Sequence, residues 1–270
     1  MKKELHIFFT ALLFYTRIPC PKNINHHPDY LNKASRYFPL IGWIVGGISF
    51  VVFYLSSLVF SVEIAVILAI IASILTTGAF HEDGFADVCD GFGGGWTKEK
   101  ILLIMKDSAI GAFGAIGLVL LFLLKYQSLV QMINSARVPD FGFGFWNFHF
   151  GIVLLFIIAH SLSRLAAISI VFTHEYSRED ASSKSKPIAQ QNSWREVLGA
   201  FFFGLVPLVI MSFFFWQILF TLIPVFLCRF FLARYFQKWI GGYTGDCLGA
   251  TQQLCEVVFY LSVIALWKFI

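Results

Sequence analysis

The sequence contains few charged residues. Asp, Glu, Lys and Arg make up 13% of its 270 residues, whereas hydrophobic residues make up 58% and the net charge is +4. This composition excludes a disordered chain and a nucleic-acid-binding domain, so we expect no nucleic-acid partner. A soluble protein of this length cannot bury so much apolar surface. The sequence therefore predicts a polytopic membrane protein.

The sequence also lacks cysteine motifs, internal repeats and a leader-type cleavage site. Its five cysteines form no CxxC pair and no zinc-type spacing with histidine, which indicates small apolar side chains. No repeat of solenoid length is present. No small-residue cleavage site precedes Pro19, so we expect no removable signal peptide.

Long apolar runs dominate what is present. Because a helix needs about 20 apolar residues to cross a bilayer, we expect an all-α bundle of about seven membrane-spanning helices in one domain, residues 1–270. The expected spans are 38–60, 62–80, 110–130, 150–172, 197–216, 217–236 and 250–270. The shorter run 5–18 is expected to lie in the membrane interface or to re-enter it.

The basic residues predict the orientation. Seven spans place four segments on one face: the N-terminal stretch to Arg36 and the loops 81–109, 173–196 and 237–249. These segments, with Arg234 at the adjoining helix end, hold 15 lysine and arginine residues, and the opposite face holds three, Lys125, Arg137 and Lys268. The positive-inside rule makes the first face cytoplasmic. The polar motifs fall in the same three loops, so we expect the active site there.

The stretch 81–91 carries three regularly spaced acids. Asp83, Asp87 and Asp90 follow an i, i+4, i+7 pattern, which places three carboxylates on one face of a helix. Like charges this close repel one another unless a cation lies between them, and carboxylate oxygens suit Mg²⁺ or Mn²⁺. The alternative is a solvated acidic turn, which is disfavoured because unpaired charge is costly at the end of a membrane helix.

Neighbouring polar residues extend this interpretation. Glu82 and Asp107 are further candidate metal ligands, and His81 is the candidate general base. Lys106 is a candidate phosphate contact; with Asp107 it is equally typical of an interfacial anchor pair.

A second glycine-rich segment, 241–250, holds Thr244 and Asp246 and predicts another phosphate or metal contact, the alternative being a plain turn. Arg164 lies inside a span, where a permanently charged fork suits a pyrophosphate. Its alternative role is structural pairing with Glu256 or a backbone carbonyl.

Arg17 and Arg178 are further candidate contacts to an anionic substrate. Together these residues predict a membrane-embedded site that binds a divalent metal and a diphosphate-linked substrate. Attack in line with the diphosphate then displaces a nucleotide.

Five motifs of the chain occur together in one known family: Thr16–Pro19, Phe38–Gly42, His81–Gly91, Met105–Gly114 and Gly241–Ala250. Through them the sequence resembles the cobalamin synthase family, the adenosylcobinamide-GDP ribazoletransferases. Three departures are visible: Ala109 stands where the family usually has arginine, Ala181–Ser183 stands where it commonly has Gly-Leu-Gly, and Cys247 replaces a common threonine.

The resemblance implies transfer of the adenosylcobinamide phosphoryl group from adenosylcobinamide-GDP to α-ribazole or its 5′-phosphate. GMP is released and Mg²⁺ is required. It also implies a multi-pass protein of a prokaryotic inner membrane, in contact with lipids, for which a homo-oligomer is one possible state.

Two other functions stay open at this point. Asp87-Val88-Cys89-Asp90-Gly91 also resembles the opening of the CDP-alcohol phosphotransferase motif, although the Ala-Arg that follows it there is absent. A phospholipid synthase using a CDP-linked donor is therefore the alternative. A transporter would distribute its acids across the membrane depth, whereas here they cluster at one face.

Overall fold

The computed structural model describes residues 2–21, 23, 27–136, 147–177 and 193–269. Throughout this part of the chain the regular structure is helical, and the one sheet-like pairing is an isolated bridge between Tyr176 and Tyr243. The predicted all-α class is confirmed. The helices are α1 Lys2–Tyr15, α2 Pro28–Ala34, η1 Ser35–Tyr37, α3 Phe38–Ser57, α4 Val62–Thr77, α5 Phe80–Gly94, α6 Lys98–Ile104, α7 Ala112–Asn134, α8 Asn147–Val171, α9 Trp194–Ser212, η3 Trp216–Thr221, α10 Leu222–Ile240 and α11 Gly245–Phe269.

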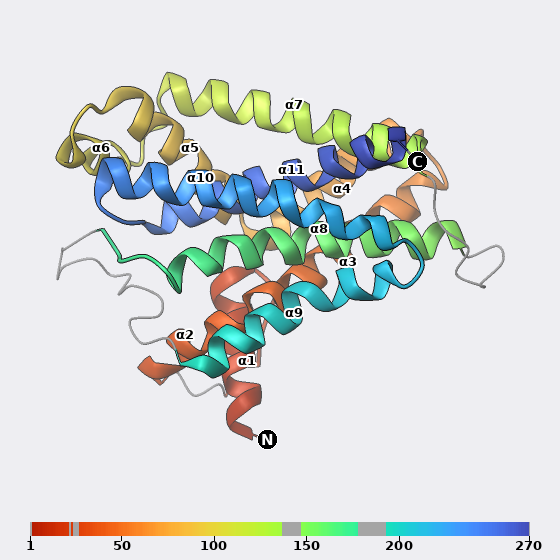
Figure 1. The fold of residues 1–270 in the computed structure, drawn as a ribbon, viewed down its shortest axis with the longest axis horizontal. Helices are drawn as coiled ribbons and strands as arrows, with labels where there is room; N and C mark the ends of the chain where they lie inside the picture. The colour runs from red at the N-terminus through yellow and green to blue at the C-terminus, as the bar shows by residue number, and fades with distance from the viewer. Residues whose placement is uncertain (1, 22, 24–26, 137–146, 178–192, 270) are drawn as a thin grey trace.

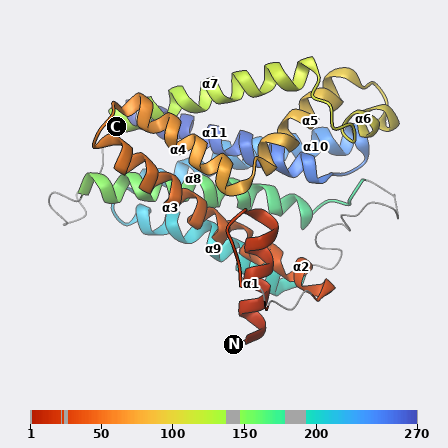
Figure 2. The same ribbon diagram turned by 180° about the vertical axis from the view of Figure 1, so that it is seen from behind.

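The long helices run side by side along the longest axis of the molecule (Figures 1 and 2). Six helical stretches of the described chain are long and apolar enough to cross a membrane, and α4 with α5 makes a seventh if that bent pair is one span. This agrees with the seven predicted spans. The most buried stretch is His149–Val171, with 89% of its most apolar window inside the protein. Helix α8 therefore forms the centre of the bundle.

At two places the helices differ from the simple membrane spans expected from the sequence. The expected spans 197–216 and 217–236 abut, and the structure separates α9 from α10 by a short turn followed by the 3₁₀ helix η3. Helix α4 is bent by 90° relative to α5. The acidic segment that follows α4, expected as part of a loop, is therefore a full helix at one end of the bundle.

Helix α1 does not join the bundle axis. It stands across the other helices in both views, and it is not among the stretches able to span a membrane (Figures 1 and 2). Arg36 anchors it, with its Nη2 atom 3.4 Å from Glu4 Oε2 of α1 and 3.9 Å from Glu196 Oε1 of α9. Its 14 residues agree with the prediction that this segment does not span, and its expected place in the membrane interface or as a re-entrant helix stays a prediction.

The assignment of Lys125 to the opposite membrane face is wrong. Lys125 lies in the middle of α7 with 2% of its surface exposed, inside the bundle. Its side chain is held by polar groups of α11, described below, and a charge surrounded in this way is tolerated away from water.

Candidate active site

The site lies at the end of the bundle where α4 meets α5. Gly78 ends α4 with φ +68°, and Ala79 follows with φ +59°. Both are left-handed conformations that turn the chain sharply. The Arg17 side chain lies against Gly78 in the space a Cβ would occupy, and the Arg17 backbone N–H donates to the Thr76 carbonyl at 2.8 Å. The predicted phosphate contact Arg17 therefore stands, exposed, at the bend.

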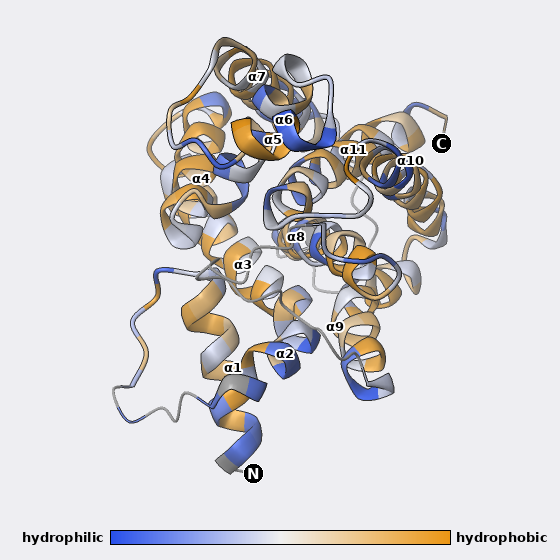
Figure 3. Ribbon diagram, turned by 90° about the vertical axis from the view of Figure 1, so that its left-hand side faces the viewer, coloured by the Kyte–Doolittle hydropathy of each residue, from blue (hydrophilic) through white to orange (hydrophobic). Residues whose placement is uncertain are grey.

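Helix α5 has two chemically different faces. His81 and Glu82 are buried toward the bundle, whereas Asp83 is exposed and Asp87 is half-buried. Asp83 and Asp87 are one turn apart, so they share a face as predicted. Figure 3, which views this end of the bundle, shows hydrophilic residues gathered on α5, α6 and the adjoining end of α10.

Two glycines bring α5 against the start of α11. A Cβ on Gly84 would lie 2.9 Å from the Asp246 Cα, and a Cβ on Gly249 would lie 3.1 Å from the His81 carbonyl oxygen. Such close approach requires the absence of side chains. Gly84 is adjacent to Asp83 and three residues from Asp87, so the backbone of Asp246 meets α5 within the stretch that carries the two predicted ligands.

Thr244 positions this start of α11. Its Oγ1 accepts a hydrogen bond from the Cys247 backbone N–H at 3.3 Å and lies 3.3 Å from Asp246 Oδ2. The side chain is fully buried. The residue predicted as a substrate contact is thus placed as the cap of the helix that carries Asp246.

Asp90 caps another helix. Its Oδ2 accepts a hydrogen bond from the Gly111 N–H at 2.7 Å, and its Oδ1 accepts one from the Gly114 N–H at 2.8 Å. These are orphan amides at the start of α7, and a carboxylate there also interacts favourably with the helix dipole. Both oxygens of this predicted metal ligand are therefore engaged by backbone in the structure.

Lys106 and Asp107 lie on the turn between α6 and α7, and both are exposed. The Asp107 Oδ1 accepts a hydrogen bond from the Ala109 N–H at 3.1 Å. This shapes the turn, and the role of Asp107 as a metal ligand stays a prediction.

The segment after α8 joins the segment after α10. The Ser177 N–H donates to the Tyr243 carbonyl at 2.8 Å, and the Tyr243 N–H donates to the Glu175 carbonyl at 3.0 Å. Burial, with Tyr176 nearby, raises the pKa of Tyr243 to about 12, so its hydroxyl stays protonated at neutral pH. Two of the three predicted site loops thus meet. Arg178 lies outside the described residues.

His81, the candidate general base, is turned away from the acids. Its ring is buried and stacks on Phe38 with the ring centroids 5.8 Å apart. Its Nε2 has no hydrogen-bond partner in the described structure. The ring therefore occupies the side of α5 opposite Asp83 and Asp87, so its service as the base stays a prediction.

Arg164 is fully enclosed, with 1% of its surface exposed. Its Nη1 donates to the His160 carbonyl at 2.9 Å, and the guanidinium carbon lies 5.7 Å from the Phe38 ring centroid. The structural alternative, pairing with a backbone carbonyl, is confirmed for this atom. The Nε has no partner within the described residues, so the proposed pyrophosphate contact stays a prediction.

A buried polar network lies beneath the site, and the sequence reasoning did not identify it. Its members come from α5, α7, α8 and α11: Glu82, Lys125, His160, Gln252, Gln253, Glu256 and Tyr260. The sequence did contain a signal for this network, because ionisable and amide side chains within apolar spans mark functional or paired positions.

The donor chemistry at the junction of α5 and α11 fits Mg²⁺. In the part of the chain that the structure describes, no three His, Cys, Asp or Glu residues are grouped closely enough to hold a metal by themselves. Mg²⁺ is commonly held by one or two carboxylates together with substrate phosphate oxygens and water. Asp83 and Asp87 supply such a pair.

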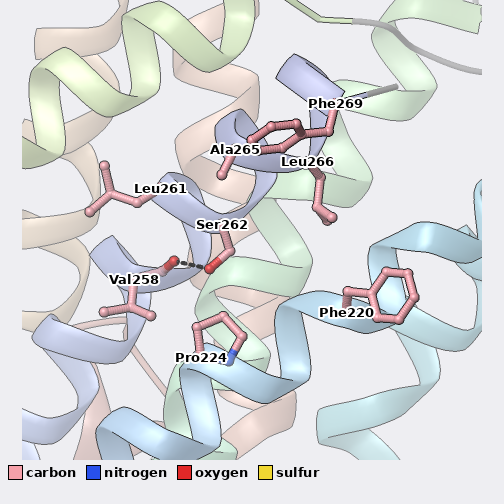
Figure 4. Close-up of a pocket in the computed structure, with 8 residues that line it drawn as sticks. All are labelled: Phe220, Pro224, Val258, Leu261, Ser262, Ala265, Leu266 and Phe269. Atoms are coloured by element: carbon pink, nitrogen blue, oxygen red, sulfur yellow. Dashed lines mark hydrogen bonds between the residues drawn. The ribbon is translucent and has the colours of Figure 1, made fainter.

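A large groove at the other end of the bundle has different chemistry. It encloses about 410 Å³ between η3, α10 and α11, and its lining is shown in Figure 4. The lining is apolar except for Ser262, whose hydroxyl donates to the Val258 carbonyl of its own helix at 2.6 Å. It offers no converging polar groups, so it is not the candidate active site.

The fold and the site define a polytopic helical membrane protein with a carboxylate-rich site at one end of the bundle. The chain belongs to the cobalamin-5-phosphate synthase family, whose model matches residues 7–265.

Proteins of similar sequence carry one functional name. The adenosylcobinamide-GDP ribazoletransferase of Shewanella amazonensis is 45% identical over 268 residues, covering 99% of this chain and 98% of the relative. That of Shewanella frigidimarina is 44% identical over 263 residues, covering 97% and 95%. No solved structure matches the chain.

Proposed function

We propose that the chain transfers the adenosylcobinamide phosphoryl group of adenosylcobinamide-GDP to α-ribazole or its 5′-phosphate, releasing GMP. The family and the names of full-length relatives support this assignment. The structural observation that carries it is the close junction of α5 and α11, where the backbone of Asp246 lies against Gly84, within the stretch of α5 that carries Asp83 and Asp87.

The reaction is a displacement at phosphorus. The acceptor hydroxyl oxygen forms a bond to the phosphorus on the cobinamide side, the bond from that phosphorus to the bridging oxygen breaks, and GMP leaves with this oxygen. The hydroxyl proton is released. Bound Mg²⁺ supplies neutralisation of the diphosphate charge.

The residues of this chain position the reactants. Asp83 and Asp87 hold the metal–diphosphate group at the end of the bundle, and the exposed Arg17 and Lys106 attract its negative charge. The glycine-mediated contact between α5 and α11 keeps the acids in place, and fixed orientation is a major part of catalysis of phosphoryl transfer.

The site faces the cytoplasm of a prokaryotic inner membrane in this proposal. The basic residues support it, since 15 lysines and arginines, counting Arg234 at a helix end, occur on the side of the acids. The substrates are charged and water-soluble at their nucleotide and phosphate ends, which suits an aqueous face.

The test uses the full chain in lipid vesicles with adenosylcobinamide-GDP and α-ribazole 5′-phosphate. We expect GMP release with Mg²⁺, none with EDTA, and a loss of at least roughly 100-fold in Asp87→Asn, which keeps the side-chain size. Ser262→Ala, in the distant apolar groove, is the matched control and retains activity.

The choice of nucleotide-linked donor in the assay distinguishes this function from that of a phospholipid synthase. Folded wild-type protein that releases no GMP from adenosylcobinamide-GDP, but transfers from a CDP-linked lipid donor to an alcohol, contradicts the proposal and supports a phospholipid synthase.

A further inference from the structure

Glu82 is directed into the bundle, away from its acidic neighbours. The side chain is buried, with 6% of the residue surface exposed. Its Oε1 accepts a hydrogen bond from Gln253 Nε2 of α11 at 2.9 Å, and its Oε2 has no partner in the described structure. The carboxylate therefore links α5 to α11 through Gln253.

The Gln253 amide is held at both ends. Its Oε1 accepts from Lys125 Nζ at 2.6 Å, and its Nε2 donates to Glu82 and, at 2.9 Å, to Gln252 Oε1. An ammonium can only donate and a carboxylate can only accept. Rotating the amide by half a turn would place NH₂ against NH₃⁺ and oxygen against carboxylate, so one orientation is fixed.

Lys125 anchors this link within the bundle. Its Nζ also lies 3.2 Å from Glu256 Oε1, and both side chains are almost fully buried. Glu256 in turn accepts from Gln252 Nε2 at 2.8 Å and from the Tyr260 hydroxyl at 3.1 Å. Because a buried charge without partners is costly, the whole set resists rearrangement.

Helix geometry connects Glu82 to the active site. Each residue advances an α-helix by about 100°, so Asp83 and Asp87 project roughly 100° and 140° around α5 from Glu82. With Glu82 held inward, both carboxylates have a fixed direction relative to α11. A rotation of α5 would move both carboxylates together relative to the junction with Asp246.

We propose that Lys125 and Gln253 are positioning residues that fix the rotation of α5 through the carboxylate of Glu82. Through this link they set where Asp83 and Asp87 meet the substrate. Glu82 therefore acts from inside the bundle and is not itself a metal ligand. The inference rests on the proposed function for its activity measurements, but the link between Glu82 and Gln253 does not.

The decisive experiment reverses the hydrogen bond. In Gln253→Glu two carboxylates face each other, and we expect kcat for GMP release to fall roughly 10- to 100-fold while KM for α-ribazole 5′-phosphate stays unchanged. In the double variant Glu82→Gln with Gln253→Glu, the new amide donates to the new carboxylate, which also pairs with Lys125. We expect this variant to recover most of the loss.

The single variants complete the set. In Glu82→Gln the amide oxygen still accepts from Gln253, so we expect a decrease of less than about fivefold in kcat and an unchanged Mg²⁺ half-saturation. Gln253→Met removes the hydrogen bond to Glu82 without adding charge. This variant replaces Gln253→Glu in the activity assay if Gln253→Glu folds poorly. Ser128→Ala is the matched control, because within the described residues its buried hydroxyl donates to the Leu124 carbonyl of its own helix alone, at 2.6 Å.

Thermal unfolding of the metal-free protein in detergent gives a readout independent of activity. We expect non-additive changes in Tm for Glu82→Gln and Gln253→Glu, with the double variant more stable than Gln253→Glu. Additive Tm changes overturn the link. A double variant as inactive as Gln253→Glu, with a raised Mg²⁺ requirement in Glu82→Gln, overturns the positioning role and makes Glu82 a metal ligand.

Failure of the proposed function gives a different pattern. If the folded wild type releases no GMP, the transferase assignment fails for every variant alike, whereas the Tm cycle still reports on the link between Glu82 and Gln253.

Discussion

Gly84 of α5 lies directly against Asp246 of α11, so close that a Cβ on Gly84 would stand 2.9 Å from the Asp246 Cα and 3.1 Å from its carbonyl oxygen. The obstacle is backbone, which cannot move aside as a flexible side chain can. The absence of a side chain at position 84 therefore sets the distance between α5 and the start of α11. The two helices can keep this contact only if that residue is glycine.

We expect Gly84→Ala to separate the two helices. The added methyl group should lower the free energy of unfolding by about 1–3 kcal/mol and reduce GMP release, because the acids move away from Asp246. Unfolding in detergent and the vesicle assay measure the two effects. Gly47→Ala is the matched control, because a Cβ there meets nothing within 4 Å. If Gly84→Ala behaves like this control, the junction does not set the site.

A second prediction concerns Asp90. Replacing it with asparagine leaves one carbonyl oxygen for two amides, so we expect a loss of about 1–3 kcal/mol in stability with the Mg²⁺ half-saturation unchanged. Asp87→Asn is the comparison, because it removes a proposed metal ligand and should raise the Mg²⁺ half-saturation. An Asp90→Asn protein of wild-type stability that needs more Mg²⁺ would instead support the metal-ligand role.

The spans were predictable from the sequence because apolar length is a local property of the chain. The bend between α4 and α5 was not, since it depends on left-handed backbone at Gly78 and at Ala79, a residue type that rarely adopts it. The sequence also did not predict which partner each acidic side chain contacts. Asp83, Asp87 and Asp90 share a face by spacing, but the amides at the start of α7, 21 and 24 residues further along, engage Asp90.

The sequence-based assignment of Lys125 to the membrane face was wrong for a related reason. Hydropathy treats a lysine near the end of an apolar run as the edge of the span, whereas the tertiary partners Gln253 and Glu256 make its burial possible. These partners are 128 and 131 residues away along the chain, and no local pattern pairs them with Lys125.

A third prediction concerns Thr244, whose hydroxyl caps α11. We expect Thr244→Val to cost about 1 kcal/mol of stability and to lower activity by disordering the Asp246 turn. Thr244→Ser keeps the hydroxyl and should retain both. Measuring KM for adenosylcobinamide-GDP separates the roles: a raised KM at unchanged stability in the valine variant would indicate direct substrate contact instead.

The fourth prediction concerns the buried ion pair of Lys125 and Glu256, whose Nζ and Oε1 atoms are 3.2 Å apart. We expect Lys125→Met and Glu256→Gln each to destabilise the protein by about 3–5 kcal/mol, because each leaves one buried charge without its partner. The double variant removes both charges, so its loss should be smaller than the sum of the single losses. Unfolding of the three variants and the wild type in one detergent gives the coupling free energy between Lys125 and Glu256. Additive losses would show that the two charges do not depend on each other.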